Sequence, residues 1–372
     1  MLTLKNQNIL YFTRAMGLGG VENVILQLCE VFAPLVNKIV VCSCGGLNVE
    51  KLKAMGIKHY EIPDMEQKSP GVILKIARSI SDIVKHENIS LIHTHHRMAA
   101  FYVEILRLYK KCLFFETAHN VYQDKIKLVK FTYRHANVIA CGEMVKKNLI
   151  DVYHIPSERI NVVHNAVKPF ENQVADDFLV KSLKEQGKFV IGNVGRLSEQ
   201  KGMEYYIQAV PMVVDKHPES RFLIIGEGPD EHNLKKLAES LGVDEYVYFT
   251  GYRSDVQNLM SQLDLVVLSS LWEGLPLTAI EAISVGKAMV ATAVGGTVEV
   301  IQDGVTGRLV EPKNPAQLAE KIIWMIEHPE QVAQMEQNAM QKFLTDFSFA
   351  SLAKGYVNCY QMTGARRQRT DV

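Results

Sequence analysis

The sequence has few cysteines, no long apolar run and no excess of either charge. Six cysteines are scattered over 372 residues, so neither a zinc site nor a disulfide framework is visible. Nowhere do about 18 apolar residues follow one another, and no basic start precedes an apolar run at the N-terminus. We therefore expect a cytoplasmic protein without a membrane-spanning helix.

The rest of the composition is that of a globular protein. Hydrophobic residues make up 47% of the chain and charged residues 22%, which excludes disordered and fibrous classes. At roughly 100–200 residues per domain, the length predicts two domains.

The balanced total charge hides an asymmetry between the two halves. Residues 1–168 hold 22 Lys and Arg against 14 Asp and Glu, a net charge of +8, and the remainder has a net charge of −8. A basic half suggests an anionic partner. Because no nucleic-acid-binding signature accompanies it, we expect a membrane surface and no nucleic acid. A solvated charge excess without any partner is the alternative.

Short β-branched or aromatic runs alternate with helical patterns along the whole chain. This alternation is typical of parallel sheets covered by helices, and it restarts after the polar segment 168–177. We predict an α/β protein with two doubly wound, Rossmann-like domains that face each other across a cleft, over residues 1–168 and 169–345. The expected strands are residues 8–13, 38–44, 90–94, 112–117, 137–141, 161–164, 189–194, 221–226, 246–250, 264–270, 288–292 and 307–311.

A glycine-rich turn, Gly17–Gly20, follows the first expected strand and opens a helix. Glycines there let backbone amides approach a phosphate near the positive end of the helix. The turn lacks the lysine and the full spacing of nucleotide-binding fingerprints, so a tight turn without a ligand is the alternative.

Two cations, Arg196 and Lys201, follow the first strand of the second domain. They stand five residues apart across a strand-to-helix turn, and two fixed cations suit a pyrophosphate. By themselves they are equally compatible with two exposed cations on a turn.

The segment from Ser269 to Glu281 carries the strongest signal. A buried strand ends at its serines, Glu273 falls in the turn, and Pro276 suits the first position of a helix that runs to about Ser284. The amides of residues 274–277 then lie at a helix N-terminus, where they can meet an anion or sugar hydroxyls. Glu273 and Glu281 can accept from two hydroxyl-bearing parts of one ligand, although Glu281 can also be read as a capping or salt-bridging residue.

These motifs together resemble a known family. The E-x7-E pair is preceded by GRLSEQKG (195–202) and LIIGEGP (223–229) and followed by residues 286–310, and this arrangement resembles the retaining GT4 glycosyltransferases of the GT-B fold. The resemblance implies transfer of a sugar from a nucleotide diphosphate donor with retained anomeric configuration. It also implies that a C-terminal helix, within about residues 346–372, returns to the first domain.

The resemblance also implies roles for individual residues. Arg196 and Lys201 would hold the diphosphate, Glu281 the ribose, and Glu273 the donor sugar near its anomeric centre. His119 would contact the donor sugar. The remaining expected donor-binding residues are Gly19, Gly20, Gly274, Leu275, Pro276 and Leu277.

Histidines end two strands of the first domain, at residues 93–96 and at His119. No carboxylate or cysteine spacing supports a metal site there, and the sequence contains no Asp-x-Asp motif. Fixed donors aimed at developing charge are worth about 3 kcal/mol each, so two cations and two helix N-termini can replace a metal. We expect a metal-independent enzyme without a cofactor. The roles of His93, His95 and His96 stay open.

The predicted function is transfer of a hexosyl-type sugar from a UDP- or GDP-sugar to an acceptor hydroxyl in the synthesis of surface polysaccharides or glycoconjugates. A nucleotide-sugar epimerase of the same fold is the alternative, and it would act on the donor alone. Basic and apolar residues interleave over 98–111 and 125–135. We expect this face to dock on the inner face of the membrane, near a lipid-linked acceptor; the alternative is that its cations only face water.

Overall fold

The computed structural model describes residues 4–170 and 176–370, and part of the polar segment 168–177 lies outside these ranges. The chain divides into two compact units. The first unit comprises the chain up to Asn165 and the segment from Leu352 onwards, and the second comprises Ala166–Ser351. The boundaries predicted from the sequence, after residues 168 and 345, differ from these by three and six residues.

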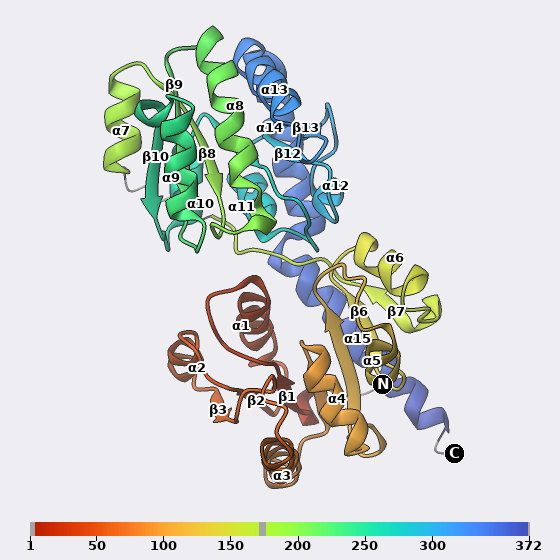
Figure 1. The fold of residues 1–372 in the computed structure, drawn as a ribbon. Helices are drawn as coiled ribbons and strands as arrows, with labels where there is room; N and C mark the ends of the chain where they lie inside the picture. The colour runs from red at the N-terminus through yellow and green to blue at the C-terminus, as the bar shows by residue number, and fades with distance from the viewer. Residues whose placement is uncertain (1–3, 171–175, 371–372) are drawn as a thin grey trace. The chain divides into compact units, whose positions relative to one another are not determined.

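The first unit contains a seven-stranded parallel sheet in the order β3-β2-β1-β4-β5-β6-β7 (Figure 1). All six strands expected there are present, and β3 is an addition. Its sequence, KHYE, is polar and pairs only with β2 at the sheet edge, so it carries no apolar signal. The strands are β1 (Asn8–Phe12), β2 (Lys38–Ser43), β3 (Lys58–Glu61), β4 (Leu91–Thr94), β5 (Leu113–Ala118), β6 (Asn137–Ala140) and β7 (Ile160–Val162).

Helices connect these strands and cover the sheet. Helices α4 and α5 lie side by side, with the rings of Phe101 and Phe131 6.0 Å apart. The helices are α1 (Gly20–Phe32), α2 (Val49–Ala54), α3 (Pro70–His86), α4 (Arg97–Ile105), α5 (Ile126–Thr132) and α6 (Glu143–Asp151).

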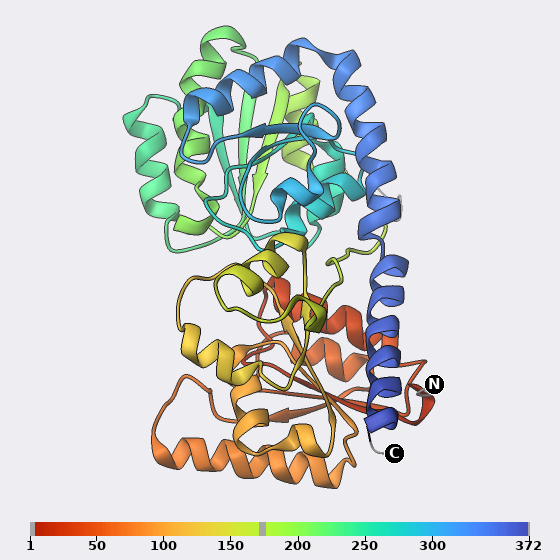
Figure 2. The same cartoon turned by 90° about the vertical axis from the view of Figure 1, so that its right-hand side faces the viewer.

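The last helix, α15 (Phe349–Thr370), packs on the first unit, as predicted (Figure 2). Its Tyr360 ring lies 4.9 Å from that of Phe32 in α1 and 4.8 Å from that of Phe115 in β5. Burying aromatic rings of this size supplies several kcal/mol, so α15 is an integral part of the core of the first unit.

The second unit contains a six-stranded parallel sheet in the order β10-β9-β8-β11-β12-β13. The six expected strands are all present, so the prediction of two doubly wound α/β domains is confirmed. The strands are β8 (Phe189–Val194), β9 (Ser220–Ile225), β10 (Val247–Gly251), β11 (Leu265–Leu268), β12 (Met289–Thr292) and β13 (Gly307–Val310).

Helices packed on the sheet explain why most of these strands are continuous apolar runs rather than alternating ones. Helix α8 packs against α13 and α9, and its Tyr206 hydroxyl donates to the carbonyl oxygen of Ile191 in β8 at 3.0 Å. All four residues of β11 are buried, as expected for a strand covered on both faces. The helices are α7 (Phe178–Glu185), α8 (Met203–Lys216), α9 (Glu231–Ser240), α10 (Val256–Gln262), α11 (Leu277–Ser284), α12 (Thr297–Val300), α13 (Pro315–Glu327) and α14 (Pro329–Lys342).

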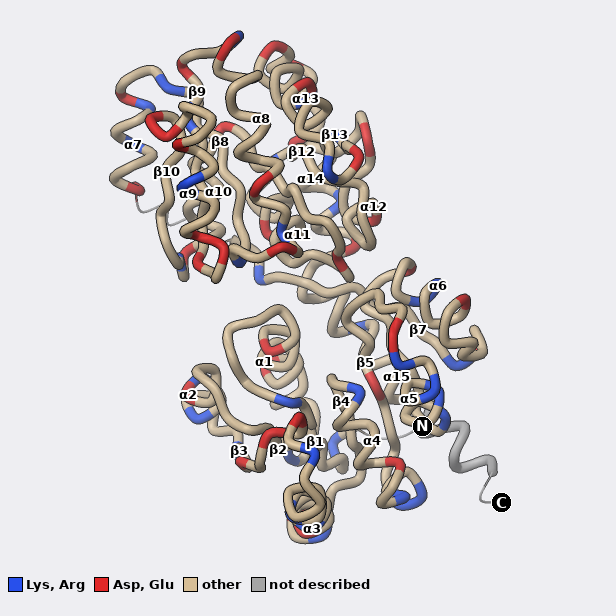
Figure 3. Tube along the Cα trace, in the orientation of Figure 1, with Lys and Arg blue, Asp and Glu red and all other residues tan. Residues whose placement is uncertain are grey.

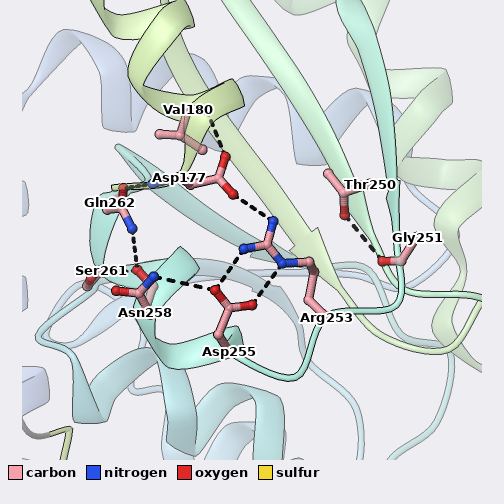
Figure 4. A network of polar contacts seen from close by, with 9 residues as sticks. All are labelled: Asp177, Val180, Thr250, Gly251, Arg253, Asp255, Asn258, Ser261 and Gln262. Atoms are coloured by element: carbon pink, nitrogen blue, oxygen red, sulfur yellow. Dashed lines mark hydrogen bonds and ion pairs between the residues drawn. The ribbon is translucent and has the colours of Figure 1, made fainter. Parts of the chain in front are cut away.

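A charged network fixes the start of α7 to the loop after β10 (Figure 4). The Asp177 carboxylate accepts from the backbone N–H of Val180 at 3.0 Å, which caps α7, and from Arg253 Nη1 at 2.6 Å. Arg253 also donates to both oxygens of Asp255, at 2.8 and 2.7 Å. Because Asp177 is buried and Arg253 largely so, these charge-assisted bonds anchor the start of α7 to the second unit.

Candidate functional site

In the second unit the loops at the carboxyl ends of the strands pack backbone on backbone. Gly295 has φ +48°, and a Cβ there would overlap the carbonyl oxygen of Glu273. Gly226 has φ +140°, and a Cβ there would overlap the carbonyl oxygen of Gly195. Only glycine combines these conformations with such close approach. The segments GEGP (226–229) and VGGT (294–297) therefore support the loops that carry Arg196 and Glu273.

Glu273 is buried and held by donors from two loops. Its Oε1 atom lies 2.6 Å from Lys201 Nζ and 2.7 Å from Ser270 Oγ. Gln200 Nε2 donates to the carbonyl oxygen of Trp272 at 3.0 Å and approaches Glu273 Oε2 at 3.5 Å. The structure thus joins two predicted site residues in an ion pair of low exposure, 16% for the Lys201 side chain and 7% for that of Glu273. The sequence did not reveal this pairing.

Glu281 projects from α11 and is half-buried. Burial raises the pKa of its carboxyl group to about 7, against the opposing effect of the positive charge on Lys201. Across the described ranges its side chain makes no hydrogen bond or ion pair, so neither a capping nor a salt-bridging role is seen. A half-buried carboxyl without a partner is ready to accept hydrogen bonds from a ligand.

Arg196 lies exposed on the loop after β8, and its guanidinium group makes no hydrogen bond or ion pair with any residue that the structure describes. Pro276 precedes α11 as its N-cap, with φ −71° and ψ 117°, and the helix begins at Leu277. The prediction that Pro276 occupies the first helical position is therefore wrong by one residue, because its extended ψ lies outside the helical range. Proline has no N–H, so the expected set of amides over residues 274–277 loses one member.

In the first unit, the glycine turn leads into α1 as predicted, with Gly19 as the N-cap. The sequence analysis overlooked Glu22, whose carboxylate folds back over Gly19. Burial raises the pKa of Glu22, and its own backbone N–H lowers it. The Glu22 carboxylate lies at the N-terminal end of α1, where a bound phosphate would also be stabilised by the helix dipole.

Two of the unassigned histidines have structural roles. The buried His93 bonds through Nδ1 to the Tyr360 hydroxyl and through Nε2 to the Thr117 hydroxyl, both at 2.7 Å, and so fixes α15 to the sheet. His96 accepts from the backbone N–H of Met98 at 3.3 Å and caps α4. Both nitrogens of His93 and the Nδ1 atom of His96 are thus used in hydrogen bonds within the first unit.

A cavity opens in the first unit at the carboxyl ends of β4 and β5. Its lining includes His95, His96, His119, Asn120 and Glu116. Among the residues described, no three His, Cys, Asp or Glu side chains are grouped closely enough to hold a metal ion.

Glu116 is a second residue that the sequence analysis missed. It is 1% exposed, and its oxygens accept from the hydroxyls of Thr94 and, at 2.8 Å, Tyr133. Burial raises its pKa to about 8, although both hydroxyls oppose the shift. A carboxylate inside the apolar run FFETA was the available signal.

Two parallel-sheet units, with a cation-carboxylate cluster at the strand ends of the second, define the class of sugar-transferring enzymes with a GT-B fold. Residues 175–342 match the family model for glycosyl transferases group 1, and residues 18–169 match that for glycosyltransferase family 4. The chain belongs to the GT4-type glycosyltransferases, and it is an enzyme of that transferase class.

Individual relatives agree with this assignment. An uncharacterized glycosyltransferase of Methanocaldococcus jannaschii is 26% identical over 294 residues, 73% of this chain and 75% of the relative. The UDP-Gal:alpha-D-GlcNAc-diphosphoundecaprenol alpha-1,3-galactosyltransferase of Escherichia coli is 26% identical over 257 residues, 64% of this chain and 66% of the relative.

Solved structures share the fold over nearly the whole chain. A glycosyltransferase from Rickettsia africae superimposes with a TM-score of 0.85 at 24% identity, covering 96% of this chain and 98% of that one. HepE of Anabaena, solved with UDP-glucose, gives a TM-score of 0.82 at 21% identity, covering 97% and 100%. These comparisons give the epimerase alternative no support.

Proposed function

We propose that this chain is a retaining glycosyltransferase that moves a hexosyl-type sugar from a UDP- or GDP-sugar to an acceptor hydroxyl. The observation that carries the proposal is the cluster at the strand ends of the second unit. There a buried carboxylate is paired with a lysine, a second carboxyl has no partner, and an exposed arginine follows β8. The UDP-glucose complex of the Anabaena relative supports a nucleotide-sugar donor.

In this proposal the cations stabilise the departing diphosphate. Arg196 and Lys201 bind its oxygens, helped by the amides at the start of α11, while Glu281 accepts from the ribose hydroxyls. The bond between the anomeric carbon and the phosphate oxygen breaks as the acceptor oxygen attacks from the same face. The acceptor proton passes to the departing phosphate oxygen. Charge on the leaving group is met by fixed cations, so the transfer needs no divalent metal.

The ion pair gives Lys201 and Glu273 linked roles. Glu273 holds the ammonium group in place before the donor binds, and this limits the reorganisation needed during the reaction. Glu273 then lies close to the positive charge that develops on the sugar. From the first unit, His119 is proposed to contact the donor sugar and the turn at Gly19 and Gly20 the donor phosphates.

Ligand-induced stabilisation tests this function. UDP-, GDP- and ADP-sugars should be compared by thermal shift, because a ligand at 100 times its Kd stabilises the native state by about 2.7 kcal/mol. One nucleotide series should raise the Tm, with Glu281→Gln reducing that rise. Incubation with the stabilising donor alone should leave the sugar unconverted, and turnover with acceptor should persist in EDTA. Formation of an epimeric sugar from the donor alone would establish the epimerase instead.

The proposed acceptor is a sugar linked to a lipid, reached by docking at the cytoplasmic face of the membrane. The E. coli relative is named for a diphosphoundecaprenol-linked substrate. No helix in the described ranges is long and apolar enough to cross a membrane. In this proposal the basic surface of the first unit makes the contact with lipid.

Helices α4 and α5 and their flanking turns carry the basic residues for this contact (Figure 3). Some of them already have partners: Arg134 pairs with the buried Glu104 at 3.2 Å and covers the ring of Phe131, and Lys125 Nζ lies 3.9 Å from an Asp124 oxygen. The lysines of α5 and its N-cap are exposed beside two exposed apolar side chains, Ile126 and Tyr122. The candidate basic residues are Lys110, Lys111, Lys125, Lys127, Lys130 and Arg134.

We expect salt-sensitive binding to vesicles that contain anionic lipid. Changing Lys125, Lys127 and Lys130 to glutamate should abolish co-sedimentation at low salt, since each cation near the surface contributes about 1 kcal/mol. Changing Lys216, Lys236 and Lys313 of the second unit to glutamate alters the net charge equally and should leave binding intact. If the unchanged protein stays in the supernatant at low salt, the proposal of docking to lipid is wrong, and a soluble acceptor becomes the better proposal.

A further inference from the structure

His95 and His119 share a hydrogen bond in the wall of the cavity of the first unit. His95 Nδ1 lies 2.9 Å from His119 Nε2, and the two rings stack with their centroids 5.2 Å apart. Burial lowers the pKa of His119 to about 4 and that of His95 well below its usual value. Both rings are therefore neutral at neutral pH, so one of them must donate and the other accept.

The surroundings of His95 fix its orientation. Its ring centroid lies 4.2 Å from that of His93, with the two rings tilted by 32°, and Tyr360 and Thr117 hold the His93 ring through both nitrogens. The ring of Tyr11 meets it edge-on at 5.8 Å. His95 itself is 4% exposed, and its Nε2 atom has no hydrogen-bond partner among the described residues.

This unpartnered nitrogen decides which ring donates. If His119 donated, His95 would carry its hydrogen on Nε2, as a buried N–H without an acceptor. If His95 donates from Nδ1, its Nε2 is a bare lone pair. Buried N–H groups without partners are rarer than unsatisfied acceptors, because desolvating a donor is costly. The second arrangement is favoured, and it leaves His119 with its hydrogen on Nδ1.

We propose that His95 is a positioning residue that holds His119 as the Nδ1–H tautomer, so that His119 offers a hydrogen-bond donor to an oxygen of the bound sugar. The nitrogen that a neutral histidine uses for its ligand is set by the bond that its other nitrogen makes. This inference rests on the proposed contact between His119 and the donor sugar. It assigns a role to His95 that the sequence left open.

Nitrogen NMR of the free protein tests the tautomer without any substrate. In protein labelled with 15N-histidine, the protonated and bare ring nitrogens of a neutral imidazole give well-separated signals, and His119→Gln identifies the His119 pair. We expect the hydrogen on Nδ1 of His119. A hydrogen on Nε2 would overturn the proposal, whether or not the protein proves to be a transferase.

Two nearly isosteric variants test the consequence for turnover. His95→Asn keeps an N–H near the place of Nδ1, whereas His95→Leu has the same branched shape without a donor. We expect His95→Leu to lower kcat roughly tenfold and to shift His119 towards the Nε2–H form, with nucleotide Kd unchanged, whereas His95→Asn retains most of the activity. If His95→Leu and His95→Asn keep the Tm of the unchanged protein and lose kcat equally, the hydrogen bond from His95 does not position His119. Failure of every variant and the unchanged protein to transfer sugar would instead refute the proposed function.

Discussion

Replacing Arg196 with alanine should lower kcat/KM by roughly 10²-fold or more without changing the Tm. The expected loss is that of one fixed donor aimed at charge on a leaving group. Arg196 is exposed and its guanidinium group makes no hydrogen bond or ion pair within the described residues, so its removal costs the fold little. Lys216→Ala, which removes an exposed cation at the end of α8, is the matched control and should leave turnover unchanged.

The corresponding Lys201 variant should lose at least as much activity and some stability as well. Lys201→Ala leaves the buried Glu273 carboxylate with Ser270 and Gln200 as its remaining donors. Removing one partner of a buried ion pair typically costs about 3–5 kcal/mol of stability. Because two hydrogen-bond donors remain here, we expect a loss of about 1–3 kcal/mol. Lys201→Ala with Glu273→Gln should restore the Tm but not the activity. Near-normal turnover in both single alanine variants would show that Arg196 and Lys201 do not stabilise the departing diphosphate.

Much of the fold could be predicted because its signal is local. Most strands lie within a sheet covered by helices and so appear as short apolar or aromatic runs, and twelve such runs matched twelve strands. Strand β3 escaped because an edge strand can be polar. The position of Pro276 depended on one ψ angle, which no pattern of residue types determines.

The site could be predicted only in part, because its contacts join distant segments. The motifs indicated Lys201 and Glu273 separately, but their ion pair spans 72 positions and depends on how β8 and β11 lie side by side. The histidines posed the same difficulty. His93 lies in β4 and His95 directly follows that strand, yet one secures α15 and the other bonds to His119.

The two glutamates should separate binding from turnover. Glu281→Gln should weaken affinity for the free nucleotide about tenfold, because a charge-assisted acceptor for the ribose is lost, and transfer should fall with it. Glu273→Gln should leave that affinity nearly unchanged and lower kcat by roughly 10²-fold. The structure supports the second expectation, since the neutral amide would release Lys201 from its ion pair while leaving the ammonium group beside the diphosphate position.

Calorimetry with the free nucleotide at two pH values completes this test. The pKa of Glu281 is about 7 before ligand binds, so its carboxyl group is mostly protonated at pH 6 and mostly ionised at pH 8. If the ionised form accepts from the ribose, affinity should rise between pH 6 and pH 8 in the unchanged protein and in Glu273→Gln. In Glu281→Gln the increase in affinity that comes from ionisation of Glu281 should be lost. Only the increase that comes from ionisation of the nucleotide's own phosphate should remain. Equal losses of affinity in the two variants, or the same pH dependence in both, would show that the carboxylates do not divide the donor in this way.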